Sequence, residues 1–506
     1  MGQNQNLAAQ IEAAFAGHAG IPLFERPNGE TVSRAALLEQ ADRMAGALAA
    51  AGIAPGDRVT VQAEKSIAFV ALYLAVLKIG AVFHPLNTAY TPAEVAFFIG
   101  DAEPAAFIAN AARLGEMAGG GRSKSRFSLE ADGSGSLMTT AASAASFGKA
   151  VARDPGDMAA LLYTSGTTGR AKGAMITHGN LASNALTLIG YWELAPGETL
   201  IHALPVYHVH GLFVALNTAL LGGLKMLWME KFDARAVLAA FAGAQVMMGV
   251  PTFFTRLLAE PGLTRESCAG MRLFISGSAP LLNETFASFQ QRTGHAVLER
   301  YGMTETGMNT SNPYRGERLA GTVGYALPGV SVRVTDDVGR ELPRGETGNV
   351  EVKGPNVFAG YWRLPEKTRE EFRADGYFIT GDQGVMAADR RLTLVGRAKD
   401  LIITGGLNVY PIEIEQALNA MPGVGESAVI GVPHPDFGEA VVAVVVTTGA
   451  DAKVASEADI IAELSQTLAK FKCPKRVVVL DELPRNSMGK VGKAQLRERF
   501  KALLVS

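Results

Sequence analysis

The strongest chemical signal in the sequence is a loop rich in glycine and hydroxyl side chains, which runs from Leu161 to Gly173 as LLYTSGTTGRAKG. Backbone N–H groups that glycine leaves accessible, together with Ser and Thr hydroxyls, form a concave donor surface suited to phosphate oxygens, and Lys172 adds positive charge. The loop is not a Walker A motif, because Lys172 stands between Ala171 and Gly173. The apolar runs on both sides, MAALLY and AMITH, argue against a flexible linker. The loop therefore predicts a phosphate-binding site.

A second group of candidate residues lies between positions 202 and 258. The segment HALPVYHVHGL holds three histidines, which could ligate a metal or, as we favour, line a pocket and form hydrogen bonds. In GVPTFFTRLL, helical spacing places Arg256 on the face that it shares with Thr252 and Phe253. An unpaired cation in so apolar a stretch would be costly. The pattern thus predicts that Arg256 receives an anionic group.

The segments that carry these residues alternate between strand and helix patterns. Strands that alternate with helices of this length indicate parallel sheets wound by helices. Residues 119–148 are rich in Gly, Ser and Ala and predict a surface excursion, whereas 320–395 show short strands with turn signals and predict an antiparallel, barrel-like region. After Arg397 a compact pattern of helices and strands resumes, long enough for a small domain. The expected fold is α/β, with a large N-terminal body and a small α+β C-terminal domain.

Composition narrows the class of protein. A hydrophobic content of 48% and a charged content of 19% exclude a disordered chain, and the net charge of -2 argues against a basic nucleic-acid binder. The 56 glycines suggest many turns and close backbone approaches. Charge is nevertheless concentrated in residues 469–501, where ten Lys and Arg stand against three acids. This segment is either a solvated helix face or a basic flap that meets phosphate.

Cysteine content and apolar runs bear on the compartment. Cys268 and Cys473 have no partner at metal-ligand spacing, and the N-terminal segment lacks the pattern of a targeting signal. The longest apolar run, residues 67–77, is too short to cross a bilayer. We expect a soluble cytoplasmic protein without membrane or nucleic-acid partners.

Five motifs follow one another along the chain: YTSGTTGRAKG, ERYGMTET at 299–306, YFITGD at 377–382, GRAKDLIITGGLNVYP at 396–411 and PRNSMGK at 484–490. In this order they resemble the core motifs of the adenylate-forming superfamily of acyl-CoA synthetases, adenylation domains and luciferases. The resemblance covers about residues 160–490 and implies an adenylate-forming domain over 1–398 and a mobile lid domain over 399–506, with the hinge at Lys399. It also implies two reactions. A carboxylate attacks the α-phosphate of ATP, with Mg2+ as cofactor, and the thiol of CoA then displaces AMP.

The same resemblance assigns nucleotide contacts to the motif positions. The residues expected to hold the phosphates are Thr164, Ser165, Gly166, Thr167, Thr168, Gly169 and Lys172. Those expected along the base are Ser276, Gly277, Ser278, Ala279 and Pro280 on one side and Arg300, Tyr301, Gly302 and Met303 on the other. Asp382 is expected to hold the ribose hydroxyls, with Arg397 assisting.

Catalytic roles follow from the resemblance as well. Thr304 is expected to donate to the α-phosphate, and Glu305 to bind Mg2+. Lys490 would neutralise charge that passes between carboxylate and α-phosphate. Gly405 and Gly406 would leave room for the pantetheine arm of CoA. The resemblance also suggests Lys490 as a target of a lysine acetyltransferase and deacetylase, because loss of its charge would stop adenylation.

The segments PVYHVHGL, GVPTFFTRLL, MRLFISGSAPL and LERYGMTETGMNTSNPY resemble those of malonyl-CoA synthetases, which also accept methylmalonate. That resemblance implies that Arg256 and Ser278, with His208 or His210 nearby, bind the distal carboxylate of malonate. Met303 would then border the C2 substituent. The alternatives are another short-chain or aryl acid:CoA ligase, an adenylation domain that loads a carrier protein, and a nucleotide sensor without catalytic activity.

Overall fold

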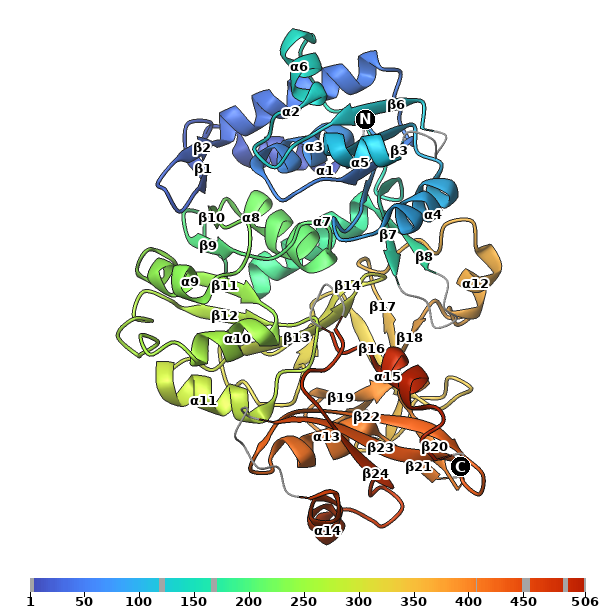
Figure 1. Cartoon of the computed structure of the whole chain (residues 1–506). Coiled ribbons are helices and arrows are strands. Elements are labelled where there is room, and N and C mark those ends of the chain that lie inside the picture. Colours follow the sequence, from blue (N-terminus) through green and yellow to red (C-terminus); the bar gives the residue numbers. More distant parts are fainter. Residues whose placement is uncertain are drawn as a thin grey trace.

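The computed structural model describes residues 4–117, 123–164, 171–405, 407–447, 456–485 and 490–504. Figure 1 shows a large body that begins at the N-terminus and a small C-terminal domain, coloured orange to red, at one end of it. The predicted α/β class, with a large body and a small C-terminal domain, is confirmed. Among the described residues, no helix combines the length and the apolar character that crossing a bilayer requires.

A six-stranded sheet forms the N-terminal layer of the body, in the order β6-β5-β3-β4-β7-β8. Its neighbours pair in parallel except β7 and β8, which form an antiparallel hairpin on either side of residues 165–170. Helix α3 is buried along its whole length, which explains why its sequence is apolar on every side. The elements are α1 (Leu7–Phe15), α2 (Arg34–Ala50), β3 (Arg58–Gln62), α3 (Ile67–Lys78), β4 (Val82–Pro85), α4 (Pro92–Ala102), β5 (Ala106–Ala109), α5 (Ala111–Glu116), β6 (Ser125–Ser128), α6 (Ser136–Ser143), β7 (Met158–Thr164), β8 (Lys172–Thr177) and α7 (His178–Tyr191).

A nine-stranded sheet forms the second layer, in the order β15-β14-β13-β12-β11-β9-β10-β1-β2. Strands β13, β12, β11 and β9 pair in parallel, so their carboxyl ends meet at one edge of the sheet. Ligands of such sheets bind at this edge. The elements are β1 (Pro22–Glu25), β2 (Thr31–Ser33), β9 (Thr199–His202), π-helix η1 (His210–Leu216), α8 (Asn217–Gly222), β10 (Lys225–Trp228), α9 (Ala234–Ala240), 3-10 helix η2 (Phe241–Gly243), β11 (Val246–Gly249), α10 (Pro251–Leu258), β12 (Leu273–Ser276), α11 (Asn283–Thr293), β13 (Leu298–Met303), β14 (Gly307–Ser311) and β15 (Tyr325–Ala326).

The predicted antiparallel region is a four-stranded sheet in the order β16-β17-β18-β19. Its strands are β16 (Ser331–Thr335), β17 (Thr347–Lys353), β18 (Phe378–Met386) and β19 (Leu392–Arg397), with helix α12 (Pro365–Glu370) between β17 and β18. The register places Asp382 opposite Arg397. The two residues predicted to hold the ribose, Asp382 and Arg397, therefore lie on neighbouring strands.

The C-terminal domain is a five-stranded sheet with three helices. Its elements are β20 (Ile402–Thr404), β21 (Leu407–Val409), α13 (Pro411–Asn419), β22 (Val424–His434), β23 (Gly438–Thr447), α14 (Glu457–Thr467), β24 (Arg476–Leu480) and α15 (Lys493–Phe500), which follow the short 3-10 helix η3 (Ala398–Asp400). Part of the basic charge of residues 469–501 is neutralised locally, since Lys493 pairs with Glu415 at 2.6 Å and Arg497 with Asp400 at 2.9 Å.

The described part of residues 119–148 lies mostly at the surface, as predicted, but it also contains regular structure that the prediction did not include. Strand β6 extends the first sheet by pairing in parallel with β5, and helix α6 follows it. The four residues of β6 are all half-buried at the edge of the sheet, and their sequence SRFS has no clear apolar alternation. Tertiary pairing therefore decides this strand, and local pattern does not.

Candidate active site

The carboxyl edge of the second sheet brings together four segments that the sequence singled out. The segment 203–210 follows β9, residues 250–258 follow β11, the loop 277–280 follows β12, and Thr304 and Glu305 follow β13. Strands β18 and β19 add Asp382 and Arg397 from the antiparallel sheet. The loop 165–170, which includes Ser165, Gly166, Thr167, Thr168 and Gly169, lies outside the described residues.

Asp382 is the centre of the predicted ribose site. Its carboxylate accepts a hydrogen bond of 2.5 Å from the Tyr301 hydroxyl and forms a 2.7 Å ion pair with Nε of Arg397. Burial raises the pKa of Asp382, while Arg397 and the Tyr301 hydroxyl oppose that rise. The structure thus confirms that these three predicted residues lie together, with the carboxylate oriented by two donors. Their binding of nucleotide stays a prediction.

Glu305 is buried next to the hairpin that flanks the phosphate loop. Its Oε1 accepts from Thr164 Oγ1 at 3.1 Å and from the Tyr361 hydroxyl at 3.2 Å, and burial raises its pKa. Within the described ranges, no three His, Cys, Asp or Glu side chains are grouped to hold a metal ion. A single carboxylate fits Mg2+ that arrives with ATP, because such ions take most of their ligands from phosphates and water.

The side chain of Lys172 has partners that the sequence did not predict. Its ammonium is buried, forms a 2.8 Å ion pair with Oε1 of Glu371 and lies 4.2 Å from the ring centre of Tyr361. The Tyr361 hydroxyl also donates to Oε2 of Glu371 at 2.7 Å. Lys172 and Glu305 are therefore linked through Tyr361 and Glu371, two residues that no sequence motif indicated because they follow the loop by almost 200 positions.

Lys490 of the C-terminal domain reaches this group of residues. Its side chain remains accessible to solvent, but the surrounding protein and Arg397 lower its pKa, while Asp382 acts in the opposite direction. Arg300 and Glu305 also contribute to its electrostatic environment. The structure thus places Lys490 in the electrostatic field of body residues that are predicted to bind the nucleotide.

The structure describes only some of the other residues that were predicted to act in the lid and the hinge. Lys399 is exposed within η3, the short turn that leads into the C-terminal domain. Gly405 is exposed with a positive φ of 57°, and Gly406 lies outside the described residues. The roles of these positions as hinge and CoA channel stay predictions.

Ser278 and His210 form the other end of the site. The Ser278 hydroxyl lies 3.2 Å from Nδ1 of His210, and the Ser278 backbone adopts a positive φ of 73°, which is strained for a residue other than glycine. The backbone N–H of His210 donates to Nδ1 of His208 at 3.3 Å. Burial, followed by Lys490 and Arg300, lowers the pKa of His208 to about 3. Both histidines are therefore neutral near pH 7, because burial lowers the pKa of His210 as well.

Arg300 is the residue whose surroundings differ most from the prediction. Its side chain on β13 is buried, and its Nε and one terminal nitrogen have no hydrogen-bond partner in the part of the chain that the structure describes. Burial lowers its pKa to about 9. The guanidinium lies against Gly277 and in the electrostatic field of His210, next to Ser278. A buried cation with unused donors is costly unless an anion joins it.

The remaining predicted residues lie nearby with one correction. Gly302, Met303 and Thr304 are half-buried at the end of β13, and Ser276, Ala279 and Pro280 continue from β12 with increasing exposure. The prediction that Arg256 sits in apolar surroundings is wrong, because its side chain on α10 is exposed. The apolar residues Phe253 and Phe254 of the same helix face the core instead. The burial argument for an anion at Arg256 therefore fails, and its proposed role depends on resemblance alone.

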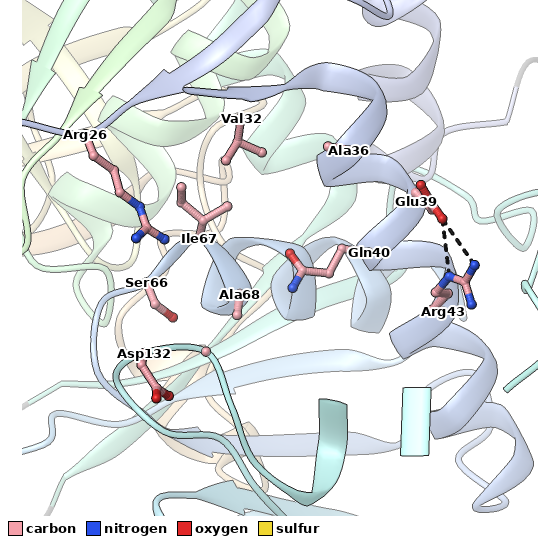
Figure 2. A pocket seen from close by; sticks show the side chains of 11 residues that line it. Arg26, Val32, Ala36, Glu39, Gln40, Arg43, Ser66, Ile67, Ala68 and Asp132 are labelled. Atoms are coloured by element: carbon pink, nitrogen blue, oxygen red, sulfur yellow. Dashed lines mark hydrogen bonds and ion pairs between the residues drawn. The ribbon is translucent and has the colours of Figure 1, made fainter. Parts of the chain in front are cut away.

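A separate cavity of about 400 Å³ lies between α2 and the start of α3 (Figure 2). None of the predicted site residues lines it. Two of its charged side chains, Arg43 and Glu39, form an ion pair with each other at 3.2 Å. This cavity is therefore distinct from the candidate active site.

Two family descriptions match the chain. "AMP-binding enzyme" matches residues 11–362, and "AMP-binding enzyme C-terminal domain" matches residues 413–490. The predicted boundary between residues 398 and 399 falls between the two matches and stays a prediction.

Curated relatives include several named as CoA ligases or synthases. Malonate-CoA ligase of Arabidopsis thaliana is 34% identical over 481 residues, which cover 88% of this chain and 78% of the relative. Feruloyl-CoA synthase of Amycolatopsis sp is 36% identical over 490 residues, which cover 94% and 95%. A probable CoA ligase of Humulus lupulus is 38% identical over 372 residues, and this match spans 68% of this chain and 61% of that protein.

Among solved structures, ATP-bound MatB from Rhodopseudomonas palustris is 52% identical, with a TM-score of 0.96 and coverage of 99% of this chain and 100% of that one. The apo form of MatB gives a TM-score of 0.83 at the same identity and coverage. The structure as a whole is therefore more similar to the ATP-bound form than to the apo form. The family descriptions span both domains of this chain, and the relatives match most of the chain's length. The chain therefore belongs to the AMP-binding enzyme family.

Proposed function

We propose that this chain ligates malonate to CoA through a malonyl-AMP intermediate, with release of pyrophosphate and AMP. The observation that carries the proposal is the buried Arg300 guanidinium, which has unused donors beside Ser278 and His210. A planar guanidinium suits a carboxylate that it binds through two hydrogen bonds. We therefore assign Arg300 to the acid substrate, in place of the nucleotide role that resemblance suggested.

The presence of two cations at the site favours a dicarboxylate. Arg300 lowers the pKa of Lys490, so the two positive charges lie within each other's electrostatic field. Two carboxylates joined by one carbon can meet both cations, one at the reacting end and one at Arg300. An alkyl or aryl acid would leave Arg300 buried without a counter-ion, which is unfavourable. Relatives named malonate-CoA ligase in Arabidopsis, mouse and human support this choice.

The residues of the chain then act as follows. Asp382 holds the ribose hydroxyls while Tyr301 and Arg397 orient its carboxylate. Glu305 would hold Mg2+, which neutralises charge on the phosphates when it is bound with ATP. Lys490 and Thr304 stabilise the charge that develops when the carboxylate attacks the α-phosphate. Rotation of the C-terminal domain at Lys399 would then bring the Gly405 face to the site, so that CoA can displace AMP.

Acid selectivity of the wild type and of Arg300→Gln tests the proposal. We expect pyrophosphate release with ATP and CoA to be fastest with malonate, followed by methylmalonate, in a panel that includes acetate, succinate and benzoate. Arg300→Gln should lower kcat/KM for malonate by at least ~30-fold, which corresponds to a lost buried charge pair of ~2 kcal/mol. Activity with acetate should change much less, because acetate has no second carboxylate.

Two results would contradict the proposal. One is a preference of the wild type for benzoate or another monocarboxylate, which would favour an aryl acid ligase. The other is an equal loss of malonate and acetate activity in Arg300→Gln. Arg256→Ala, measured in the same panel, decides whether the exposed arginine of α10 also takes part.

A further inference from the structure

Lys65 is a buried lysine that lies outside the residues assigned to ATP, acid or CoA. It precedes α3, in the first layer of the body, yet its Nζ reaches the second sheet. There it lies 2.7 Å from the carbonyl oxygen of His202, 2.6 Å from that of Met229 and 3.0 Å from Nδ1 of His202. Its ammonium also stands 4.3 Å from the ring centre of Trp228, which favours a positive charge.

These contacts determine the tautomer of His202. Its other ring nitrogen, Nε2, lies 2.9 Å from the carbonyl oxygen of Gly211 and must carry a proton to donate to it. Nδ1 faces Lys65, and two carbonyl oxygens already take two protons of the Lys65 amine. Burial lowers the pKa of Lys65 and that of His202 alike, so the intrinsically more basic lysine keeps the remaining proton, and Nδ1 accepts it as a hydrogen bond. His202 is therefore neutral, with its proton on Nε2.

The His202 hydrogen bond reaches the acid end of the site through π-helix η1. Gly211, which accepts it, is the second residue of η1, and His210 is the first. The Gly211 backbone packs closely against the preceding turn, because an ideal Cβ on Gly211 would lie 2.0 Å from the carbonyl oxygen of Pro205. Single π-helical turns occur often at functional sites. The hydrogen bond from His202 to Gly211 thus fixes the start of η1. It thereby also positions the His210 ring beside Ser278.

We propose that Lys65 is a positioning residue for acid recognition, which sets the tautomer of His202 and through Gly211 orients His210 toward Ser278. This inference rests on the proposed function, because it assigns His210 and Ser278 to the acid substrate. It extends that function to a residue in the connection between β3 and α3, which no motif assigned to a substrate.

The test combines a tautomer measurement with substrate kinetics. Nitrogen-15 NMR of histidine-labelled wild type, with His202 assigned from a His202→Gln sample, should show a protonated Nε2 and an unprotonated Nδ1. In Lys65→Met, Nδ1 loses its donor, so this preference should be weaker, although the Gly211 carbonyl oxygen still accepts from Nε2. KM for malonate should rise about 5- to 10-fold, the scale of one hydrogen bond, while KM for ATP stays within about twofold.

Lys78→Met is the matched control. Lys78 is also a buried lysine, at the end of α3, but it pairs with Glu12 and Asp42, away from His202. The Lys78→Met variant should lose stability without a selective change in KM for malonate. A joint rise of both KM values in Lys65→Met would indicate a merely structural role and overturn the inference.

Two further outcomes keep the inference separate from the proposed function. A wild-type His202 with its proton on Nδ1 overturns the inference without any variant, even if Lys65→Met does not fold. If the enzyme prefers an acid other than malonate, the proposed function fails, but KM for that acid against KM for ATP still tests the role of Lys65.

Discussion

Gly277 and Arg300 lie so close together that an ideal Cβ on Gly277 would stand 2.3 Å from the guanidinium carbon of Arg300. The backbone of Gly277 has no positive φ, so the close approach of this side chain, and not backbone strain, requires glycine. The position of the Arg300 guanidinium therefore depends on the absence of a Cβ at Gly277.

Gly277→Ala should displace the Arg300 guanidinium while the strand and loop remain folded. We expect KM for the acid substrate to rise about 10- to 100-fold, as for the loss of a charge-assisted hydrogen bond. Steady-state kinetics with varied acid at saturating ATP measure this effect. Gly190→Ala on α7 is the control, because a Cβ there meets no atom within 4 Å. An unchanged KM in Gly277→Ala would show that Arg300 does not contact the acid.

The positive φ of Ser278 separates two contributions of this residue. Ser278→Ala and Ser278→Gly both remove the hydroxyl that lies 3.2 Å from His210 Nδ1, so both should raise KM for the acid about 5- to 10-fold. Only glycine relieves the backbone strain, which costs on the order of 1 kcal/mol. Thermal unfolding should therefore give a higher Tm for Ser278→Gly than for Ser278→Ala. Equal Tm values would mean that no strain is stored at this position.

Glu299 should make stability depend on pH. It is buried on β13, and burial raises its pKa to about 7, although the backbone N–H groups of Gly321 and Leu281 oppose the rise. Because the folded-state pKa lies above the ordinary value of 4.5, the protonated form is favoured in the folded protein. The stability that this group contributes is present below about pH 4.5 and is lost as the pH rises through about 7.

Glu299→Gln should consequently match the wild type near pH 5 and be more stable at pH 8, by up to ~3 kcal/mol. Thermal unfolding of both proteins at the two pH values measures the difference. Glu284→Gln, which changes an exposed carboxylate of the neighbouring helix α11, should follow the wild type at both. A Glu299→Gln variant that is less stable than the wild type at pH 8 would contradict the prediction.

Lys490→Ala should separate the two reactions. Removal of an ammonium near the attacked phosphate should slow acyl-AMP formation, measured as pyrophosphate release, by at least ~100-fold. Thioester formation from supplied acyl-AMP should persist, because that step is expected with the C-terminal domain rotated. Lys501→Ala removes an exposed lysine of the same domain and should change neither step. Equal loss of both steps in Lys490→Ala would rule out the two-conformation role.

Much of the secondary structure was predictable from local pattern. The parallel sheets wound by helices followed directly from the alternation of strand and helix patterns, and the antiparallel sheet β16–β19 followed from the short strands with turn signals in residues 320–395. Strand β6 did not, because an edge strand of four half-buried residues owes its conformation to pairing with β5. The exposure of Arg256 was missed for a related reason, since an apolar run does not reveal which side of a helix faces solvent.

The sequence by itself, through the resemblance of its five motifs, predicted which residues meet the nucleotide. Each of the five motifs places its reactive groups within a few residues, so their chemistry can be predicted from the sequence alone. The structure then brings Tyr301, Asp382 and Arg397 together. Only the tertiary structure revealed the buried Arg300 with unused donors, to which the proposal assigns the acid. Alternation along β13 sends Arg300 to the face opposite Glu299 and Tyr301, where two loops from other strands meet it. Lys65 and His202, 137 positions apart, become partners only because the two sheets pack against each other.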